Sequence, residues 1–197
     1  VWRNSGWVLL GSALILALSL GVRHGFGLFL PPMSAQFGWG REVFAFAIAL
    51  QNLMWGLAQP FTGALADRFG AARVVIVGGV LYAVGLVMMG MSDSPLSLSL
   101  SAGLLIGVGL SGTSFSVILG VVGRALPPEK RSLGMGIASA AGSFGQFAML
   151  PGTLELIGWL GWSSALLVLG LLVALIVPLV SMLKDRPMPA LGGEQTL

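Results

Sequence analysis

Residues 74–92, VVIVGGVLYAVGLVMMGMS, form a run of 19 residues without a charge, bounded by Arg73 and Asp93. A helix that crosses the hydrocarbon core of a bilayer needs about 20 mostly apolar residues. Barrel strands are about ten residues long and alternate in polarity, which this run does not. The run therefore predicts a transmembrane α-helix.

The composition of the whole chain agrees with that prediction. Of its 197 residues, 56% are hydrophobic and 9% are charged, and the mean hydropathy is +0.95. An average soluble domain carries about a quarter charged residues, and disordered chains are poor in apolar residues. We therefore expect an integral membrane protein. The chain has no cysteine and one histidine, so we expect no metal site and no cofactor.

Five other stretches are as long and as poor in charge, and we predict an all-α integral membrane protein with six transmembrane helices. The predicted spans lie near residues 7–30, 43–66, 72–91, 97–124, 132–155 and 160–183. Prolines at 31–32, 95 and 127–128 fall in the predicted gaps, where a missing amide costs no helical hydrogen bond. Residues 1–183 form one predicted bundle, and 184–197 a cytoplasmic tail or the start of an interdomain linker.

Basic residues divide unequally between the two sides of this predicted topology. One side would carry Arg3, Arg68, Arg73, Arg124, Lys130, Arg131, Lys184 and Arg186, and only Arg41 falls in a loop on the other side. Cytoplasmic loops of membrane proteins are enriched in Lys and Arg, so both termini should be cytoplasmic. Topology then explains the net charge of +3, and we expect no nucleic-acid partner.

The loop between the second and third predicted helices reads GALADRFGAAR, residues 63–73. Gly63 and Gly70 allow close backbone approach, Asp67 suits the start of the following helix, and Arg68 and Arg73 hold the turn in the cytoplasm. An ordinary positive-inside turn is the alternative. The complete spacing resembles the signature loop of the major facilitator superfamily. It departs at residues 71–72, both alanine, where that family often carries two basic residues.

Residues 128–143, PEKRSLGMGIASAAGS, resemble the basic-then-small motif of helix five in monocarboxylate porters and oxalate–formate exchangers. Residues 37–41 resemble the loop before their second helix. Small residues repeat every four positions here, which favours close helix packing. The predicted packing motif consists of Lys130, Arg131, Gly134, Gly136, Ala138 and Gly142.

This resemblance implies the N-terminal half of a carrier with two six-helix halves, each built from two three-helix repeats. It implies transport of a small organic anion, a monocarboxylate or dicarboxylate, by alternating access with proton symport or anion exchange. It also implies a bacterial inner membrane, a latch in which Arg124 pairs with Asp67, and a second half in the same chain, a homodimer or a separate subunit. A half-size homodimeric carrier and a non-transporting membrane scaffold are the alternatives.

Arg23 lies within the first predicted span, where a charge costs several kcal/mol unless it faces water or a partner. It either attracts an anion in a pathway or extends to the outer headgroups. The neighbouring His24 either titrates or packs. Other polar residues line the same pathway or hydrogen-bond between helices. The predicted pathway set is Arg23, Ser19, Gln51, Asn52, Trp55, Gln59, Ser114, Ser143 and Gln146.

Residues 109–112, GLSG, match the nucleophile turn of six-span intramembrane serine proteases. Ser111 would need a base to activate it, and those enzymes use a histidine on the sixth helix. The single histidine here, His24, lies in the first predicted span. The protease is therefore a remote alternative to a carrier.

Overall fold

The computed structural model describes residues 2–183, and within that range every regular element is helical. The first segment consists of α1 (Trp2–His24), the 3-10 helix η1 (Gly25–Phe29) and α2 (Leu30–Phe37). Pro31 and Pro32, expected in the gap after the first span, occupy the first turn of α2. That position tolerates proline because first-turn amides have no intrahelical acceptor. The expected end of the first helix at residue 30 is therefore wrong.

The next two helices, α3 (Arg41–Phe69) and α4 (Ala71–Gly90), are joined by a single residue. That residue is Gly70, whose φ is 91°. Residues with a side chain rarely adopt this backbone conformation, so the tight reversal depends on glycine here.

The fourth predicted helix is present in several pieces. They are α5 (Pro95–Leu98), the π-helix η2 (Ser99–Leu105), α6 (Ile106–Thr113) and α7 (Phe115–Ala125). Ser94 caps α5 through its side chain, which accepts from the amide of Ser97. Ser114 is extended, with φ −102° and ψ −169°, and so breaks the helix between α6 and α7.

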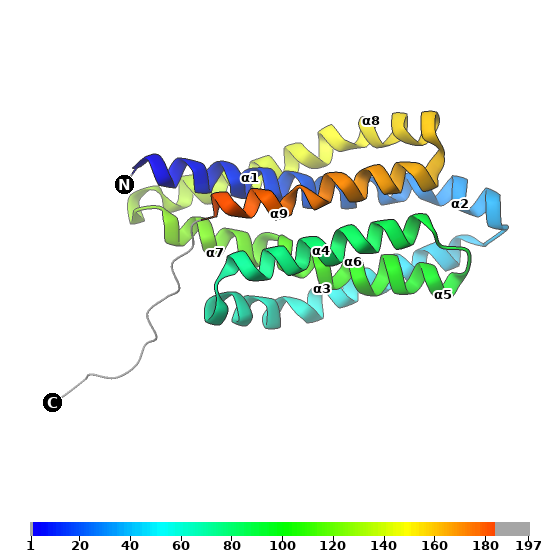
Figure 1. Ribbon diagram of the computed structural model, residues 1–197, viewed down its shortest axis with the longest axis horizontal. Coiled ribbons are helices and arrows are strands. Elements are labelled where there is room, and N and C mark those ends of the chain that lie inside the picture. The colour runs from blue at the N-terminus through cyan, green and yellow to red at the C-terminus, as the bar shows by residue number, and fades with distance from the viewer. Residues whose placement is uncertain (1, 184–197) are drawn as a thin grey trace.

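The remaining chain forms α8 (Pro128–Ala174), α9 (Ile176–Leu179) and the 3-10 helix η3 (Val180–Met182). Gly161, at φ 77° and ψ 163°, interrupts α8. The chain turns back on itself within α8, so the later part of this segment runs antiparallel to the earlier part (Figure 1).

Four described segments are long and apolar enough to cross a membrane: Ser5–Phe37, Ala71–Gly90, Pro95–Ala125 and Pro128–Met182. The last contains 55 residues and includes the reversal at Gly161. The 29-residue α3 is not among the four, and its sequence carries the polar side chains of Gln51, Asn52 and Gln59. These segments agree with the expected all-α membrane protein.

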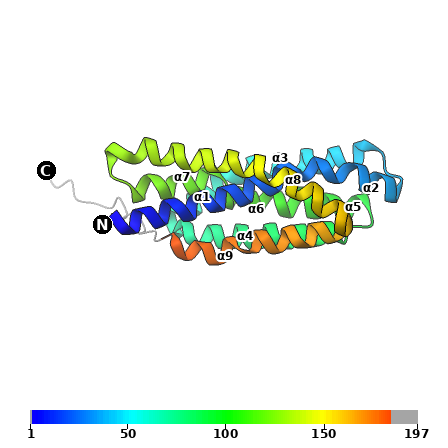
Figure 2. The same cartoon turned by 90° about the horizontal axis from the view of Figure 1, so that it is seen from above.

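The segments lie side by side along one long axis (Figures 1 and 2). The N-terminal end of α1, the α3–α4 turn, the α7–α8 turn and η3 lie at one end of the bundle (Figure 1). The α2–α3 and α4–α5 turns lie at the opposite end. The turns that contain Arg68, Arg73, Arg124, Lys130 and Arg131 therefore share one end, as the predicted topology requires.

Small residues bring α8 close to its neighbours. Gly134, Ala138, Gly142 and Gly145 are buried on one face of α8, and a Cβ at Gly21 of α1 would lie 2.7 Å from the carbonyl oxygen of Gly145. Gly136 is different, because it is exposed and a Cβ there would meet nothing within 4 Å. Within residues 2–183, Gly136 therefore lies on a face of α8 that no other described helix covers.

Candidate functional site

The guanidinium of Arg23 is held by α3. Its Nη2 donates to Oδ1 of Asn52, and its Cζ lies 4.6 Å from the ring centroid of Trp55. Asn52 donates its own Nδ2 to the carbonyl of Ile48 at 2.9 Å, which orients Oδ1 toward Arg23. The Nε of Arg23 is buried and has no hydrogen-bond partner among the described residues. Both partners of this cation are uncharged.

The position of Arg23 along its segment is relevant to the alternative that its side chain extends to the outer lipid headgroups. The segment continues as helix to Phe37, so Arg23 lies in its interior rather than near its end. Its side chain contacts α3 across the bundle instead of extending along α1. The guanidinium is therefore held by α3 in the interior of its helical segment.

The network continues from Arg23 to the helix break. Trp55 donates its Nε1 to Oγ of Ser114 at 3.0 Å. Ser19 of α1 shares a hydrogen bond of 2.8 Å with Thr113, the last residue of α6, and the backbone carbonyl of Ser19 accepts from the Tyr82 hydroxyl at 3.1 Å. Helices α1, α3, α4, α6 and α7 therefore meet around the break.

A cavity of about 560 Å³ adjoins this network. It lies between the first helical segment and α3, and its size is within the range of about 300–1,000 Å³ for small-molecule sites. Its walls are mostly apolar, with a few polar groups at Arg23, His24, Gln51 and Asn52. His24 is exposed within the described part of the chain.

The structure divides the predicted pathway residues into three groups. Arg23, Asn52, Trp55, Ser114 and Ser19 belong to the network above. Gln51 lines the cavity, but its Nε2 donates to the carbonyl of Ala102 at 2.7 Å, a contact that ties α3 to η2. Within residues 2–183, neither the cavity lining nor the network includes the side chains of Gln59, Ser143 and Gln146.

Sequence reasoning missed Tyr82. It is the single tyrosine of the chain and is fully buried in α4. A buried tyrosine hydroxyl usually has a hydrogen-bond partner, so this residue alone would have suggested a polar contact inside the bundle. The partner itself, the Ser19 carbonyl, could not be identified without the tertiary structure, in which the Tyr82 side chain of α4 reaches the backbone of α1.

A second charged feature lies at the end of the bundle that contains the N-terminus. Nη1 of Arg124 lies 3.3 Å from Oδ1 of Asp67, and the two side chains are 28% and 59% exposed. The expected ion pair between α7 and α3 is therefore present. The Cζ of Arg68 lies 5.2 Å from the ring centroid of Phe69, and Nε of Arg131 donates to the carbonyl of Leu126 at 3.2 Å.

The protease interpretation gains nothing from the geometry. Ser111 is buried and donates its hydroxyl to the carbonyl of Val108 at 2.6 Å, within its own helix. Its carbonyl accepts from Thr62 at 3.2 Å. Among residues 2–183 no group of three or more His, Cys, Asp or Glu side chains could hold a metal ion.

A sequence profile of the Major Facilitator Superfamily matches residues 9–196. The chain belongs to the Major Facilitator Superfamily. The expected membership is thereby confirmed, and so is the resemblance to monocarboxylate transporters. Monocarboxylate transporter 11 of Mus musculus is 34% identical over 190 residues, which are 96% of this chain and 41% of the relative. The Homo sapiens protein of the same name is 31% identical over 185 residues, 93% and 39% of the two chains.

The chain is also similar to a bacterial transporter in sequence and to a solved transporter structure in fold. An uncharacterized MFS-type transporter of Escherichia coli, YhjX, is 29% identical over 144 residues, 73% of this chain and 35% of that one. The crystal structure of the POT family transporter PepTSo superposes with a TM-score of 0.74 at 17% identity, over 95% of this chain and 39% of that one. At this identity the superposition supports the fold alone. The chain spans about two fifths of the length of these relatives.

Proposed function

We propose that this superfamily chain forms the N-terminal six-helix bundle of a secondary carrier for a small organic anion, a monocarboxylate or dicarboxylate. The observation that carries the proposal is Arg23, a cation inside a membrane segment whose described partners are uncharged and which lines a cavity. The named relatives include monocarboxylate transporters, which agrees with this substrate class. They point to a transporter rather than an enzyme.

Six spans follow if α3 also crosses the bilayer and the segment with Gly161 crosses twice. The length of α3, 29 residues, exceeds the roughly 20 that a crossing needs. Both chain ends then lie on one side, which we propose is the cytoplasm because the basic turns lie there. A bacterial inner membrane is the proposed location, in agreement with the Escherichia coli relative.

Arg23 would bind the carboxylate of the substrate by charge-assisted hydrogen bonds, which are stronger than neutral ones. The incoming carboxylate would compete with Oδ1 of Asn52 for the Arg23 guanidinium. Because Oδ1 is a neutral acceptor, replacing it with a charged carboxylate would be favourable. The apolar cavity walls would exclude water and strengthen the attraction. Proton symport would require a proton-carrying group in the pathway, while anion exchange would require none.

Alternating access requires a second bundle against which this one rocks. Several apolar side chains are exposed on α3 and the first part of α8, such as Leu57 at 56%, Phe144 at 67% and Phe147 at 74%. We propose that a second half, in the same chain, a homodimer or a separate subunit, covers part of this surface. The Asp67–Arg124 ion pair would act as a latch for one access state, and the break at Ser114 would let α6 and α7 move separately.

Uptake into liposomes tests the proposal. The full protein is reconstituted, and entry of radiolabelled lactate or oxalate is measured with an inward proton gradient or with unlabelled anion inside. Arg23→Gln should lower kcat/KM by about ten- to hundred-fold, the loss expected for hydrogen bonds to a charged group, and Arg23→Lys should restore part of it. Arg41→Gln is the matched control, since Arg41 lies at the start of α3 and outside the network.

Three outcomes separate the alternatives. Uptake by Arg23→Gln equal to that of the wild type would show that Arg23 does not bind substrate. Absence of uptake of every anion by a folded wild type would favour a membrane scaffold. If uptake occurs only in preparations where two copies of this chain can be crosslinked to each other, a homodimeric carrier is favoured.

A further inference from the structure

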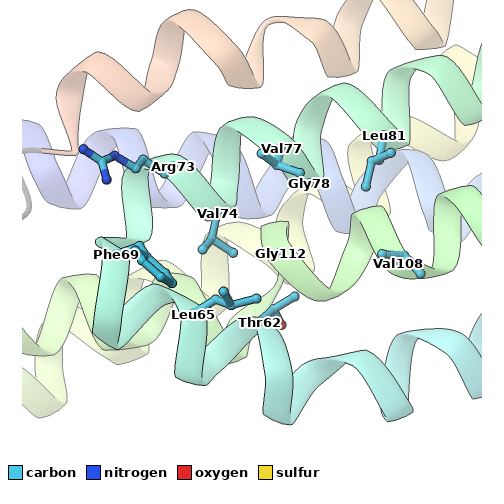
Figure 3. A pocket seen from close by; sticks show the side chains of 10 residues that line it. All are labelled: Thr62, Leu65, Phe69, Arg73, Val74, Val77, Gly78, Leu81, Val108 and Gly112. Carbon is cyan, nitrogen blue, oxygen red and sulfur yellow. The ribbon is translucent and has the colours of Figure 1, made fainter.

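A second hollow lies between α3, α4 and α6, and it shares no lining residue with the cavity at Arg23 (Figure 3). Its volume is about 330 Å³, near the lower limit of ligand pockets. The hollow is therefore a groove distinct from the proposed transport site.

Close contact between α4 and α6 creates the groove. A Cβ at Gly78 of α4 would lie 2.8 Å from the carbonyl oxygen of Gly109 and 3.1 Å from Cα of Gly112 in α6. Gly78 and Gly112 have no side chains, so neither residue fills the floor of the groove between these two helices. Leu65 and Phe69 of α3 form a wall on one side.

Apart from Arg73, the walls offer no free hydrogen-bond donor to a polar solute. Val77 and Phe69 are 59% and 46% exposed, and they lie beside or within a segment that can cross a membrane. Thr62 is the one polar wall residue apart from Arg73, and its hydroxyl already contacts the carbonyls of Ala58, Gln59 and Ser111 at 3.1, 3.1 and 3.2 Å. Such a groove suits a hydrocarbon chain, since a peptide would bring backbone groups that need partners.

Charge is present at one end of the groove. Figure 3 shows Arg73 at one end and Leu81 and Val108 at the other. Arg73 is exposed in the first turn of α4 and, within residues 2–183, has no ion-pair partner. Its neighbours in the turn are engaged, because Asp67 pairs with Arg124 and Arg68 lies over Phe69. The positive charge at this mouth is therefore not neutralised by Asp67.

We propose that this groove binds an anionic phospholipid, with one acyl chain between α3, α4 and α6 and the phosphate at Arg73. An apolar slot that ends in one exposed arginine complements a molecule with a hydrocarbon tail and one negative head. Arg73 begins a membrane-spanning helix, so its side chain reaches the depth of the headgroups. Basic groups between transmembrane helices are known binding positions for anionic headgroups.

Native mass spectrometry of the full protein in detergent tests the proposal. The protein is titrated with palmitoyl-oleoyl phosphatidylglycerol and, separately, with the phosphatidylcholine that has the same chains. The wild type should retain one phosphatidylglycerol at least about tenfold more tightly than phosphatidylcholine. Arg73→Gln should lose that preference and Arg73→Lys should keep it. Arg131→Gln, which removes a cation at the same end of the bundle, should leave it unchanged.

A second pair of variants tests the acyl-chain slot without changing charge. Val77→Trp fills the groove from its exposed side and should abolish the tight phosphatidylglycerol. Val80→Trp makes the same change at an exposed residue of α4 that does not line the groove, and it should have no effect. Thermal unfolding in detergent establishes that each variant is folded. Equal retention of the two lipids by the wild type, or equal behaviour of the two tryptophan variants, would overturn the proposal.

Discussion

Arg23 and Arg124 are the same side chain in two different settings. Arg124 pairs with the carboxylate of Asp67 at 3.3 Å, at the basic end of the bundle. Arg23 lies inside its helical segment and contacts the amide oxygen of Asn52 and the ring of Trp55. An arginine with an internal carboxylate is already neutralised and can stabilise a conformation. An arginine with neutral partners can still bind an anion from outside, so the partners decide between the two roles.

The largest expected effect comes from making the Arg23 site resemble the Arg124 site. Asn52→Asp places a carboxylate beside Arg23, and a substrate anion must then displace an internal charge. We expect the KM for anion uptake to rise by about ten- to hundred-fold, equivalent to about 1.4–2.8 kcal/mol. Asn52→Ala, which removes the amide without adding charge, is the control and should have a smaller effect. A KM for Asn52→Asp equal to that of the wild type would contradict the distinction between the two sites.

An intermediate effect is expected from Ser114, which supports Trp55. Ser114→Ala removes the acceptor for Nε1 of Trp55 and leaves a partly buried donor without a partner. The cost should be about 1 kcal/mol, seen as a roughly fivefold weaker anion affinity and a lower Tm. Ser116→Ala is the matched control, because Ser116 is exposed and its hydroxyl makes only a 3.4 Å contact to the Ser111 carbonyl. Equal effects of the two variants on anion affinity would show that the hydrogen bond between Trp55 and Ser114 does not contribute to anion binding.

The smallest effect is expected at the ion pair. Asp67→Asn removes a pair whose members are 28% and 59% exposed, and such pairs are worth about 0.2–1 kcal/mol. The Tm should fall slightly in low salt and much less in 1 M salt, where charges are screened within about 3 Å. The KM should stay near that of the wild type, while the rate of exchange between access states changes. A KM increase as large as that of Asn52→Asp would show that both arginines act on the substrate.

Sequence patterns predicted those features that depend on neighbours along the chain. The charge-free run 74–92 coincides closely with α4, because bilayer thickness and helical rise together set its length. Gly70 supports the one-residue turn between α3 and α4, and the loop that contains it also indicated the superfamily. The same local reasoning was wrong for Pro31 and Pro32, because a first helical turn accommodates proline as well as a gap does.

Within the candidate site, sequence separation limited what could be predicted. The spacing of Asn52 and Trp55 placed them on one helical face, but it contained no information on which helix that face meets. Their contact with Arg23, 29 residues earlier than Asn52, depends on the rotation of α1 and α3 about their axes. The burial of Gly145 and the exposure of Gly136 depend on helix packing in the same way.

Runs of apolar residues and short motifs are local properties, and they were enough to predict the membrane class, the helical fold, the approximate helices and the superfamily. Which charges are paired and which are not became visible only with the packing of the helices. It joined Arg124 to Asp67, left Arg23 with neutral partners beside a cavity, and placed Arg73 at the end of an apolar groove. The physical reason is that the environment of a charge depends on side chains from other helices.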